Sequence, residues 1–309
     1  MKLHTDNETF SQLQRAAGDS LGLPFEAIKR DYYIVLLLAR LADSPWAKEC
    51  VFKGGTSLSK CYPESIKRFS EDIDLTYMAP ADISDKQCSR RLKQIEKIMS
   101  AGFACQKNQE ERNDRNKSLT IILDGESTVK LEIGSSVQPE PYAPKIIKTY
   151  IQEFLERENL PDVIDEYDLQ GVCINVLSIN RTFIDKVMAV KRHAICGNIS
   201  NKARHIYDVV SLLPRPDIQA FINDKTELKR LLKLTKETDG FYLQKRNISK
   251  EYNPLGKYDF DSWAAAFQTA KSSYEKLHEN LLYTDEKQDF AQAAEAFAQL
   301  GRIFAEIDE

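Results

Sequence analysis

The chain has 309 residues, of which 42% are hydrophobic, and its 43 Lys and Arg against 47 Asp and Glu give a net charge of −4. This composition supports one large or two ordinary hydrophobic cores, and the acidic balance argues against a protein that coats nucleic acid with a generally basic surface. The longest apolar run, residues 32–39, is far shorter than the roughly 18 residues of a membrane helix, and the first residues lack the plan of a signal peptide, so we expect a soluble, cytoplasmic protein.

The first predicted elements lead to a glycine turn. Residues 6–19 form a polar amphipathic start, and the apolar positions of residues 24–42 keep a helical period on a broad face, which predicts a buried helix. After a break at Ser44-Pro45, a short apolar stretch runs into Gly54-Gly55 and then into a helix start. Adjacent glycines let the backbone approach an anion, and the free N–H groups of a helix N-terminus point at it. The turn therefore suits a phosphate.

Two aspartates follow in the stretch RFSEDIDL. If residues 69–75 lie in a strand, alternation places Asp72 and Asp74 on one face and Ile73 and Leu75 on the other, toward a core. Neighbouring carboxylates repel each other unless a cation lies between them. Mg²⁺ suits such a pair because it prefers oxygen ligands and often combines one or two carboxylates with substrate phosphates.

A helix over residues 81–101 comes next, closed by Gly102, followed by strands over 103–106, 119–123 and 128–134. The polar stretch 107–117 between the first two strands is interpreted as an exposed, mobile hairpin loop. The last strand places Lys130 and Glu132 on the face opposite its apolar residues. Glu132 is a candidate third carboxylate if this strand neighbours the aspartate strand; otherwise it belongs to the wet face of an ordinary amphipathic strand.

The second half of the chain is mainly helical. The Pro-rich run 138–144 is interpreted as a linker, which divides the chain into domains 1–137 and 138–309. A helix over residues 145–157 and a strand over 171–179 are expected after it. The remaining predicted helices begin at Asn180, follow the turn at Gly197-Asn198, and span 218–235, 258–282 and 289–307.

Two of these helices carry polar residues that favour either of two interpretations. Lys186 lies at the edge of an apolar stripe, and Arg204 and Asp208 are four residues apart on one helix face. They are either a solvated lysine and an exposed i,i+4 pair, or part of a nucleotide site. A local basic patch of this kind can hold a triphosphate, an RNA backbone or both, and its members are Lys186, Lys191, Arg192, His193, Lys202, Arg204 and His205.

The motifs together resemble a known family. GGTSLSK followed by RFSEDIDL, and later RTFIDKVMAVKRH and RHIYDVVSL, are similar to the AbiEii/AbiGii nucleotidyltransferase-like toxins of the DNA polymerase beta-type nucleotidyltransferase superfamily. The resemblance covers about residues 30–215. It implies an α/β (α+β) nucleotidyltransferase core, with a mixed sheet flanked by helices, followed by a mostly α-helical C-terminal domain that closes the nucleotide cleft.

The resemblance also implies roles for single residues. Asp72, Asp74 and Glu132 would bind one or two Mg²⁺ ions, although a glutamate at 132 is one carbon longer than the family's aspartate. Lys186 would contact the triphosphate, and Asp208 would either orient a neighbouring group or act as a general base. The residues expected to bind the nucleotide are Gly54, Gly55, Thr56, Ser57, Lys60, Arg68, Ser70, Lys186 and Arg204.

By this resemblance we expect transfer of a nucleoside monophosphate from an NTP to an acceptor hydroxyl. The protein would be the toxin of a bacterial toxin–antitoxin or abortive-infection system, with a cognate antitoxin as partner and tRNA as one candidate acceptor. Two alternatives stay open from the sequence. One is transfer to a small molecule, as in antibiotic-modifying enzymes, or to a protein, and the other is a catalytically silent nucleotide-binding relative.

Overall fold

The computed structural model describes residues 1–124, 127–243, 252–280, 282–284 and 286–307. The chain forms two compact units. The first consists of Met1–Cys61 and Phe69–Leu177, and the second of Tyr62–Arg68 and Ser178–Glu309. In the described part of the chain, no helix combines the length and the apolar character needed to cross a membrane.

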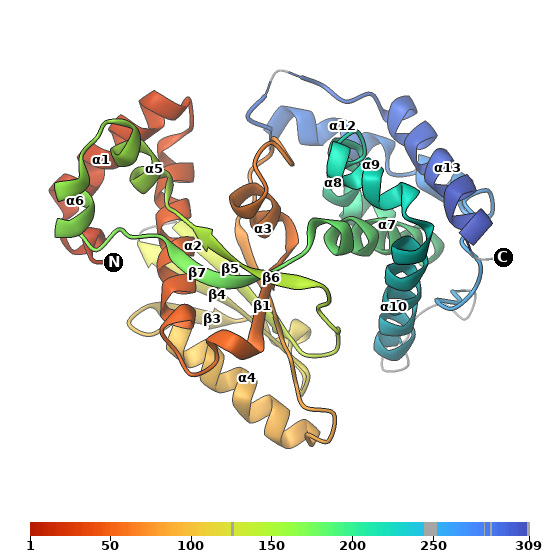
Figure 1. Ribbon diagram of the computed structural model, residues 1–309, viewed down its shortest axis with the longest axis horizontal. Helices are drawn as coiled ribbons and strands as arrows, with labels where there is room; N and C mark the ends of the chain where they lie inside the picture. The colour runs from red at the N-terminus through yellow and green to blue at the C-terminus, as the bar shows by residue number, and fades with distance from the viewer. Residues whose placement is uncertain (125–126, 244–251, 281, 285, 308–309) are drawn as a thin grey trace. The chain divides into compact units, whose positions relative to one another are not determined.

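The first unit is a mixed sheet with flanking helices (Figure 1). Its strands are β1 (Cys50–Lys53), β2 (Asp72–Tyr77), β3 (Ala104–Lys107), β4 (Asn116–Asp124), β5 (Ser127–Gly134), β6 (Tyr142–Ile147) and β7 (Val172–Leu177). Its α-helices are α1 (Asn7–Leu21), α2 (Phe25–Ala42), α3 (Gly54–Cys61), α4 (Asp85–Met99), α5 (Tyr150–Arg157) and α6 (Pro161–Glu166). Short 3₁₀ helices are η1 (Leu3–Thr5), η2 (Ala47–Glu49) and η3 (Gln109–Glu111).

The seven strands pair in the order β3-β4-β5-β2-β1-β7-β6. The pairs β2–β5 and β1–β7 are parallel, and the other four pairs are antiparallel. Parallel pairing of β2 with β5 sets two strands side by side that are about 50 residues apart in the sequence, through the crossover that α4 and the β3–β4 hairpin provide.

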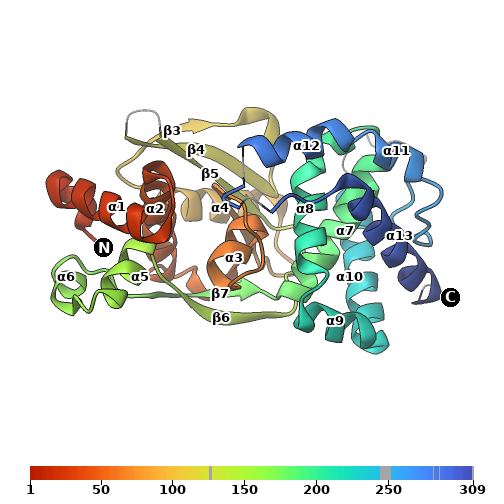
Figure 2. The same cartoon turned by 90° about the horizontal axis from the view of Figure 1, so that it is seen from above.

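The two faces of the sheet are covered differently. Apolar side chains of β2 and β5, including Ile73 and Leu131, are buried on the face that packs against α2 and α4. On the opposite face of the same strands, Asp72, Asp74, Lys130 and Glu132 are partly buried. On this second face α3 covers β1, β6 and β7, and the first three residues of β1 are buried. The helices α3 and α4 therefore lie on opposite sides of the sheet (Figure 1), and the view from above has α3 in front of it (Figure 2).

Helices α1, α2 and α5 form a further apolar cluster in the first unit. Phe10 packs on Tyr32 with ring centroids 4.7 Å apart, and Tyr33 meets both rings edge-on. Ile151 and Leu155 of α5 complete this cluster. These contacts anchor the N-terminal helices to the sheet unit, because α2 belongs to both cores.

The second unit is helical. It contains α7 (Ile179–Ile195), η4 (Ile199–Lys202), α8 (Ala203–Leu212), α9 (Pro216–Asn223), α10 (Lys225–Leu243), α11 (Ala264–Gln268), α12 (Lys271–Asn280) and α13 (Phe290–Ile307). Its core is rich in aromatic side chains: Trp263 and Phe267 pack against Phe297 of α13, with centroid distances of 6.4 and 5.0 Å. The segment 62–68 joins this unit through Tyr283, whose hydroxyl donates to the carbonyl oxygen of Ile66 at 2.8 Å.

The predicted fold class is confirmed: a mixed sheet with flanking helices is followed by a helical region. Individual elements differ. Residues 142–147, which the sequence assigns to a linker and a helix start, form the edge strand β6, where Pro144 is tolerated because an edge strand needs fewer ladder donors. The sheet unit accordingly continues to Leu177, past the predicted boundary at 137/138.

The predicted helix 218–235 is two helices. Asp224 ends α9 and accepts a hydrogen bond from the backbone N–H of Glu227 at 3.1 Å, which caps the start of α10. The predicted helix 258–282 is likewise divided into α11 and α12. The predicted helices 24–42 and 289–307 match α2 and α13 within one residue at each end.

Candidate active site

The glycine turn between β1 and α3 lies directly against Asp74. Gly54 has a φ of +86°, a conformation that L side chains rarely adopt. A Cβ on this residue would overlap the carboxylate oxygen Oδ2 of Asp74 and would lie 3.0 Å from its Cγ and 3.1 Å from its Cβ. The turn therefore requires glycine for two reasons, and it brings the N-terminus of α3 next to the Asp74 carboxylate, which the helix dipole favours.

The hydroxyl groups that follow the glycines bind within the protein. Thr56 Oγ1 donates to the carbonyl oxygen of Asp72 at 2.5 Å and lies 2.9 Å from the hydroxyl of Ser70. Ser57 is fully buried, and its hydroxyl donates to the carbonyl oxygen of Gly54 at 2.9 Å. These bonds tie the glycine turn to the start of β2. The nucleotide contacts expected for Thr56, Ser57 and Ser70 stay a prediction, and the bonds give all three a structural role.

The sheet register places the predicted carboxylates side by side. Asp74 of β2 lies opposite Glu132 of parallel β5 and opposite Lys53 of antiparallel β1. Asp72 lies opposite Lys130 in the next row. Residues opposite each other on neighbouring strands point to the same face, so these five side chains share what we call the carboxylate face of the sheet.

A lysine already contacts the third carboxylate. Lys130 Nζ lies 2.5 Å from Glu132 Oε1 and 2.8 Å from Glu111 Oε2, so that it joins the two glutamates. Burial alone would lower the pKa of Lys130, but its bonds to Glu111 and Glu132 raise it, and the ammonium stays charged. The bonds from Lys130 and from the Ser118 hydroxyl lower the pKa of Glu111. Glu132 is thus charge-compensated without a metal ion.

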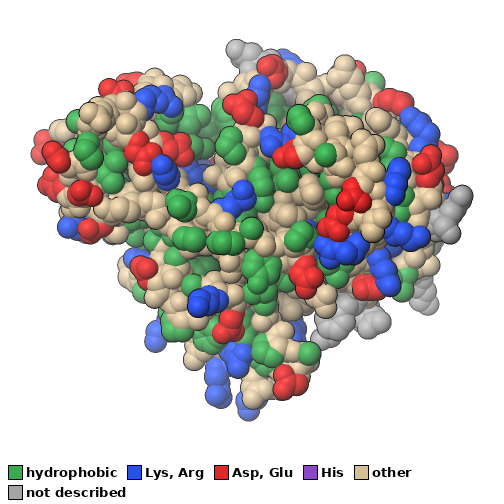
Figure 3. All heavy atoms as spheres, viewed as in Figure 1, with side chains coloured by type: hydrophobic (Ala, Val, Ile, Leu, Met, Phe, Trp, Pro, Cys, Tyr) green, Lys and Arg blue, Asp and Glu red, His purple; other side chains and the backbone are tan. Residues whose placement is uncertain are grey.

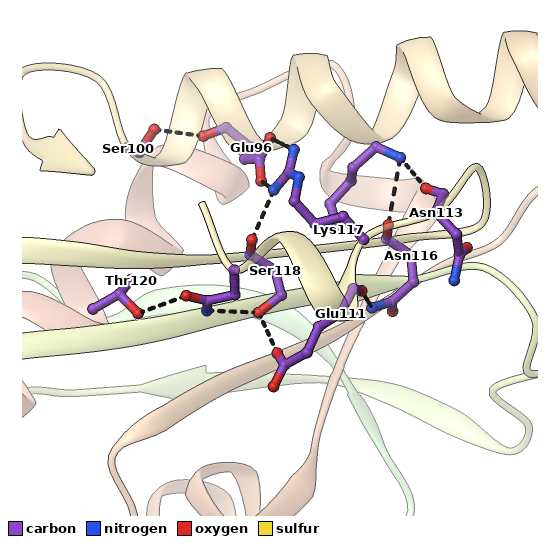
Figure 4. A network of polar contacts seen from close by, with 10 residues as sticks. Glu96, Ser100, Glu111, Asn113, Asn116, Lys117, Ser118 and Thr120 are labelled. Carbon is purple, nitrogen blue, oxygen red and sulfur yellow. Dashed lines mark hydrogen bonds and ion pairs between the residues drawn. The ribbon is translucent and has the colours of Figure 1, made fainter. Parts of the chain in front are cut away.

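The loop that carries Glu111 is held by a polar network (Figure 4). The Ser118 hydroxyl donates to Glu111 Oε2 at 2.6 Å, and the side-chain amide of Asn116 donates to the Glu111 carbonyl oxygen at 2.7 Å. Arg112 donates to Glu96 of α4 at 2.9 Å and to the Ser118 carbonyl oxygen at 2.7 Å. The segment expected to be a mobile loop is therefore pinned both to α4 and to β4.

The chemistry of the carboxylate face fits Mg²⁺ in part. Asp72 and Asp74 present carboxylate oxygens from one face of β2, which is the donor type that Mg²⁺ prefers. Glu132 lies beside Asp74, but its carboxylate binds Lys130. Throughout the described ranges, no group of three or more His, Cys, Asp or Glu side chains is arranged to hold a metal ion. Asp72 and Asp74 thus offer the donor type, and Glu132 could act as a third donor only by exchanging Lys130 for the ion.

Lys60 of α3 lies in the interior of the first unit. Its Nζ is 2.8 Å from Asp31 Oδ1 of α2 and 4.0 Å from the centre of the Tyr150 ring, and only 3% of its side chain is exposed. The backbone N–H of Tyr150 donates to the other Asp31 oxygen at 2.7 Å. Burial raises the pKa of Asp31 and Lys60 opposes that effect. Lys60 thus joins α3 to α2 and α5, and its predicted contact with a nucleotide would have to break this pair.

In the second unit, Asp208 is the centre of a buried ion-pair cluster. Arg68 donates to both of its carboxylate oxygens at 2.7 Å, and Lys186 Nζ lies 2.7 Å from Oδ2. All three side chains are at most 6% exposed. Burial would raise the pKa of Asp208, but Arg68 and Lys186 outweigh it and lower the pKa. A carboxylate whose oxygens already bind two cations is a poor general base, so the geometry favours the orienting role for Asp208 over the basic one.

The basic patch expected around Lys186 is internal only in part, since two of its seven residues are buried and five are partly exposed. Lys186 and Lys191 are buried, and Arg192 pairs with Asp239 of α10. Arg204 is partly exposed on α8, and its predicted nucleotide contact stays a prediction. Two of the cations that the sequence assigns to an anion-binding surface, Lys186 and Arg192, therefore form ion pairs within the second unit.

Sequence reasoning did not assign a role to two residues beside the predicted site. Lys130 is two positions before Glu132 in the same strand, so strand alternation was a sufficient signal that the two share a face. Glu111 lies in a polar loop without periodicity, and no local pattern indicates its bond to Lys130. Their contacts make both residues part of the charge balance of the carboxylate face.

One protein family and two solved structures are similar to this chain. A model of the family described as nucleotidyl transferase AbiEii toxin, Type IV TA system, matches residues 36–306. A proposed nucleotidyltransferase from H. pylori has a similar structure, at 15% identity and a TM-score of 0.46, over 92% of this chain and 96% of that one. MenT4, a nucleotidyltransferase toxin from Mycobacterium tuberculosis H37Rv, is similar at 18% identity and a TM-score of 0.48, over 97% of each chain. A search of curated proteins gave no match.

Proposed function

The chain belongs to the AbiEii nucleotidyl transferase toxin family and is a nucleotidyltransferase, and from this premise we propose that it transfers a nucleoside monophosphate from an NTP to a hydroxyl of tRNA in a Mg²⁺-dependent reaction. The acceptor oxygen forms a bond to the α-phosphorus, the bond from that phosphorus to the bridging oxygen breaks, and pyrophosphate leaves. The hydroxyl proton passes to solvent.

One observation carries the proposal for this chain: Asp74 lies between the N-terminus of α3 and Glu132 of β5. The glycine turn and the helix N-terminus offer backbone N–H groups and a positive dipole end to phosphate oxygens. The carboxylates beside it are the oxygen donors that a divalent cation needs. Phosphate-binding and cation-binding groups thus adjoin each other, as phosphoryl transfer requires.

Asp72 and Asp74 would hold Mg²⁺, and Glu132 would join them after releasing Lys130. The ion supplies charge that offsets the developing negative charge on the attacking and leaving oxygens. The protein's own contribution is position. The bonds of Thr56 to Ser70 and to the Asp72 carbonyl oxygen fix the turn against β2, so the phosphate-binding N–H groups and the carboxylates keep one mutual geometry.

The family match supports a toxin with an antitoxin partner, and we include both in the proposal. A small-molecule hydroxyl would need the same phosphate-binding and cation-binding groups as a hydroxyl of tRNA. A nucleotide transferred to tRNA near the acceptor end would block aminoacylation, which is a chemical reason for toxicity.

The test is incubation of the purified protein with Mg²⁺, total tRNA and each labelled NTP in turn, alongside Asp74→Asn. The substitution keeps the size of the side chain and removes its charge. We expect label on tRNA with the wild type and a loss of about 10³-fold or more in the variant, since Asp74 is the central donor of the site. Equal labelling by both proteins would refute the assignment of Asp74, and label on a small molecule alone would refute the assignment of tRNA.

A further inference from the structure

Exposed cations of the first unit gather on one helix. The outer face of α4 carries Lys86, Arg90, Lys93 and Lys97, at spacings of four, three and four residues. These spacings place all four on one side of the helix, over about 16 Å at a rise of 1.5 Å per residue. We call them the α4 basic stripe. Figure 3 shows Lys and Arg side chains over this helix.

The stripe faces away from the core. On the opposite side of α4, Leu92, Ile95 and Met99 are buried against the sheet, whereas all four cations are exposed. Packing of the buried side therefore fixes the orientation of α4, so the four cations lie on a rigid element and not on a loop.

The acidic residues of α4 do not neutralise the stripe, because each has another partner. Asp85 accepts from Arg115 at 2.7 Å, and Glu96 accepts from Arg112 at 2.9 Å. Among the described residues, no carboxylate forms an ion pair with any member of the stripe. Residues 85–117 carry nine Lys and Arg against five Asp and Glu, a net charge of +4 in a chain of net charge −4.

We propose that the α4 basic stripe binds the phosphate backbone of the RNA acceptor. The inference rests on the proposed function, since it specifies where that acceptor is held. Repeated cations on one rigid face match a repeated anion, and contacts to phosphate position an RNA without reading its sequence. The stripe lies on the side of the sheet opposite to α3, so an RNA held there has to pass around the edge of the sheet for its end to reach the carboxylate face. An RNA of tRNA size extends well beyond one helix, so its body can lie on the stripe while its end reaches that face.

The side chains around the stripe favour RNA over an acidic protein. Stable protein interfaces depend on a buried apolar or aromatic centre. The other exposed side chains of α4 are polar, among them Gln87 and Gln94, and none of the exposed large hydrophobic residues of the described chain lies on this helix. A surface of cations and amides suits phosphates and riboses, which require no apolar anchor.

The experiment measures binding of a fluorescently labelled tRNA transcript to the full chain by anisotropy, without NTP or divalent cation, over a series of salt concentrations. The test variant is Lys86→Gln, Arg90→Gln, Lys93→Gln and Lys97→Gln combined. The control removes four exposed cations from α10, three of which are ion-paired, by Lys225→Gln, Lys229→Gln, Arg230→Gln and Lys233→Gln. Both variants change the net charge equally, so a loss of binding confined to the stripe variant cannot result from net charge alone.

We expect the stripe variant to bind the transcript at least about tenfold more weakly and to lose about three to four from the slope of log K against log salt, roughly one for each phosphate contact. The α10 control should bind within about twofold of the wild type. Equal loss in both variants, or in neither, would overturn the proposal. A competition experiment uses polyglutamate of the same charge as the transcript. If polyglutamate displaces the transcript at equal concentration, the proposal is also overturned, because the stripe would then be a surface for an acidic protein.

This binding assay is independent of nucleotide transfer, so the two proposals can fail separately. Transfer to tRNA by a stripe variant that binds RNA normally would leave the function standing and refute the stripe. If the wild type binds RNA through the stripe but transfers no nucleotide, the stripe proposal stands and the proposed function is refuted. Asp74→Asn should retain RNA binding, and circular dichroism with thermal unfolding should show that both four-site variants are folded.

Discussion

Replacement of Gly54 by alanine should displace the Asp74 carboxylate while leaving the fold intact. The added Cβ would overlap Asp74 Oδ2 and lie 3.1 Å from the Asp74 Cβ. Because the added Cβ also approaches the Cβ of Asp74, rotation of the carboxylate alone cannot relieve the contact. Either the side chain leaves its rotamer or the turn moves away from β2, and in both cases the phosphate-binding and cation-binding groups lose their mutual position.

The expected magnitudes separate stability from activity. A non-glycine residue at the φ of +86° costs about 1–2 kcal/mol of folding free energy, and an off-rotamer Asp74 adds about 0.5–1.5 kcal/mol. The free energy of unfolding of the variant should therefore be about 1.5–3.5 kcal/mol lower than that of the wild type, and the variant should remain folded at 25 °C. Transfer activity should fall by about 100-fold, since a displacement of about 1 Å in a catalytic group has an effect of that size.

Gly102→Ala is the matched control. Gly102 has a φ of +79°, so it shares the backbone cost, but nothing lies within 4 Å of its Cβ position. Urea unfolding gives the stability of both variants, and labelled-NTP transfer to tRNA gives their activity. Electron paramagnetic resonance of Mn²⁺ reports cation binding at the Asp74 site independently of turnover.

We expect the two variants to differ by about 1 kcal/mol in stability and by about 100-fold in activity. Mn²⁺ affinity should fall in Gly54→Ala alone. If both variants retain the same activity and the same Mn²⁺ affinity, the contact between Gly54 and Asp74 has no functional consequence and the reasoning is wrong.

Two further predictions concern the charges around each cluster. Lys130→Met removes the cation that binds Glu132 and should raise Mn²⁺ affinity by about three- to tenfold, ~0.6–1.4 kcal/mol, in the resonance assay; weaker binding would show that Lys130 supports the site. Asp208→Asn leaves Arg68 and Lys186 buried without their anion and should cost about 3–5 kcal/mol in urea unfolding at pH 7. The pKa of Asp208 in the folded protein lies below its ordinary value of 3.8, so its contribution to folding stability is present above pH 3.8 and is lost as the pH falls through the folded pKa. The difference in the free energy of unfolding between Asp208→Asn and the wild type should therefore narrow at that low pH. A difference that stays constant with pH would refute the ion-pair origin.

Strand alternation was sufficient to predict most of the carboxylate face. The apolar residues Ile73 and Leu75 had to face a core, which left Asp72 and Asp74 on the opposite face, and the same argument placed Glu132 in its own strand. Strand alternation does not predict which strands pair when they are about 50 residues apart in the sequence. The prediction that Glu132 neighbours Asp74 came from the family resemblance, and the parallel register of β2 and β5 confirms it.

The partners of the predicted basic residues were beyond local patterns. Lys60 binds Asp31, 29 residues earlier, and Arg68 binds Asp208, 140 residues later. A lysine near a glycine turn has the same local sequence whether it faces a phosphate or a buried carboxylate. Only the packing of α3 against α2 and α5 decides between these, since it removes Lys60 from solvent and places Asp31 within reach.

The two charged clusters differ in solvent access, and this difference determines what each can do. Both oxygens of the buried Asp208 bind cations, so exchange with an incoming ion would leave Arg68 and Lys186 buried and uncompensated. Glu132 is 36% exposed and Lys130 is 30% exposed, and Glu111 offers the lysine a second carboxylate. Lys130 can therefore release Glu132 without becoming unpaired, which makes the exchange of a lysine for a divalent cation inexpensive there and costly at Asp208.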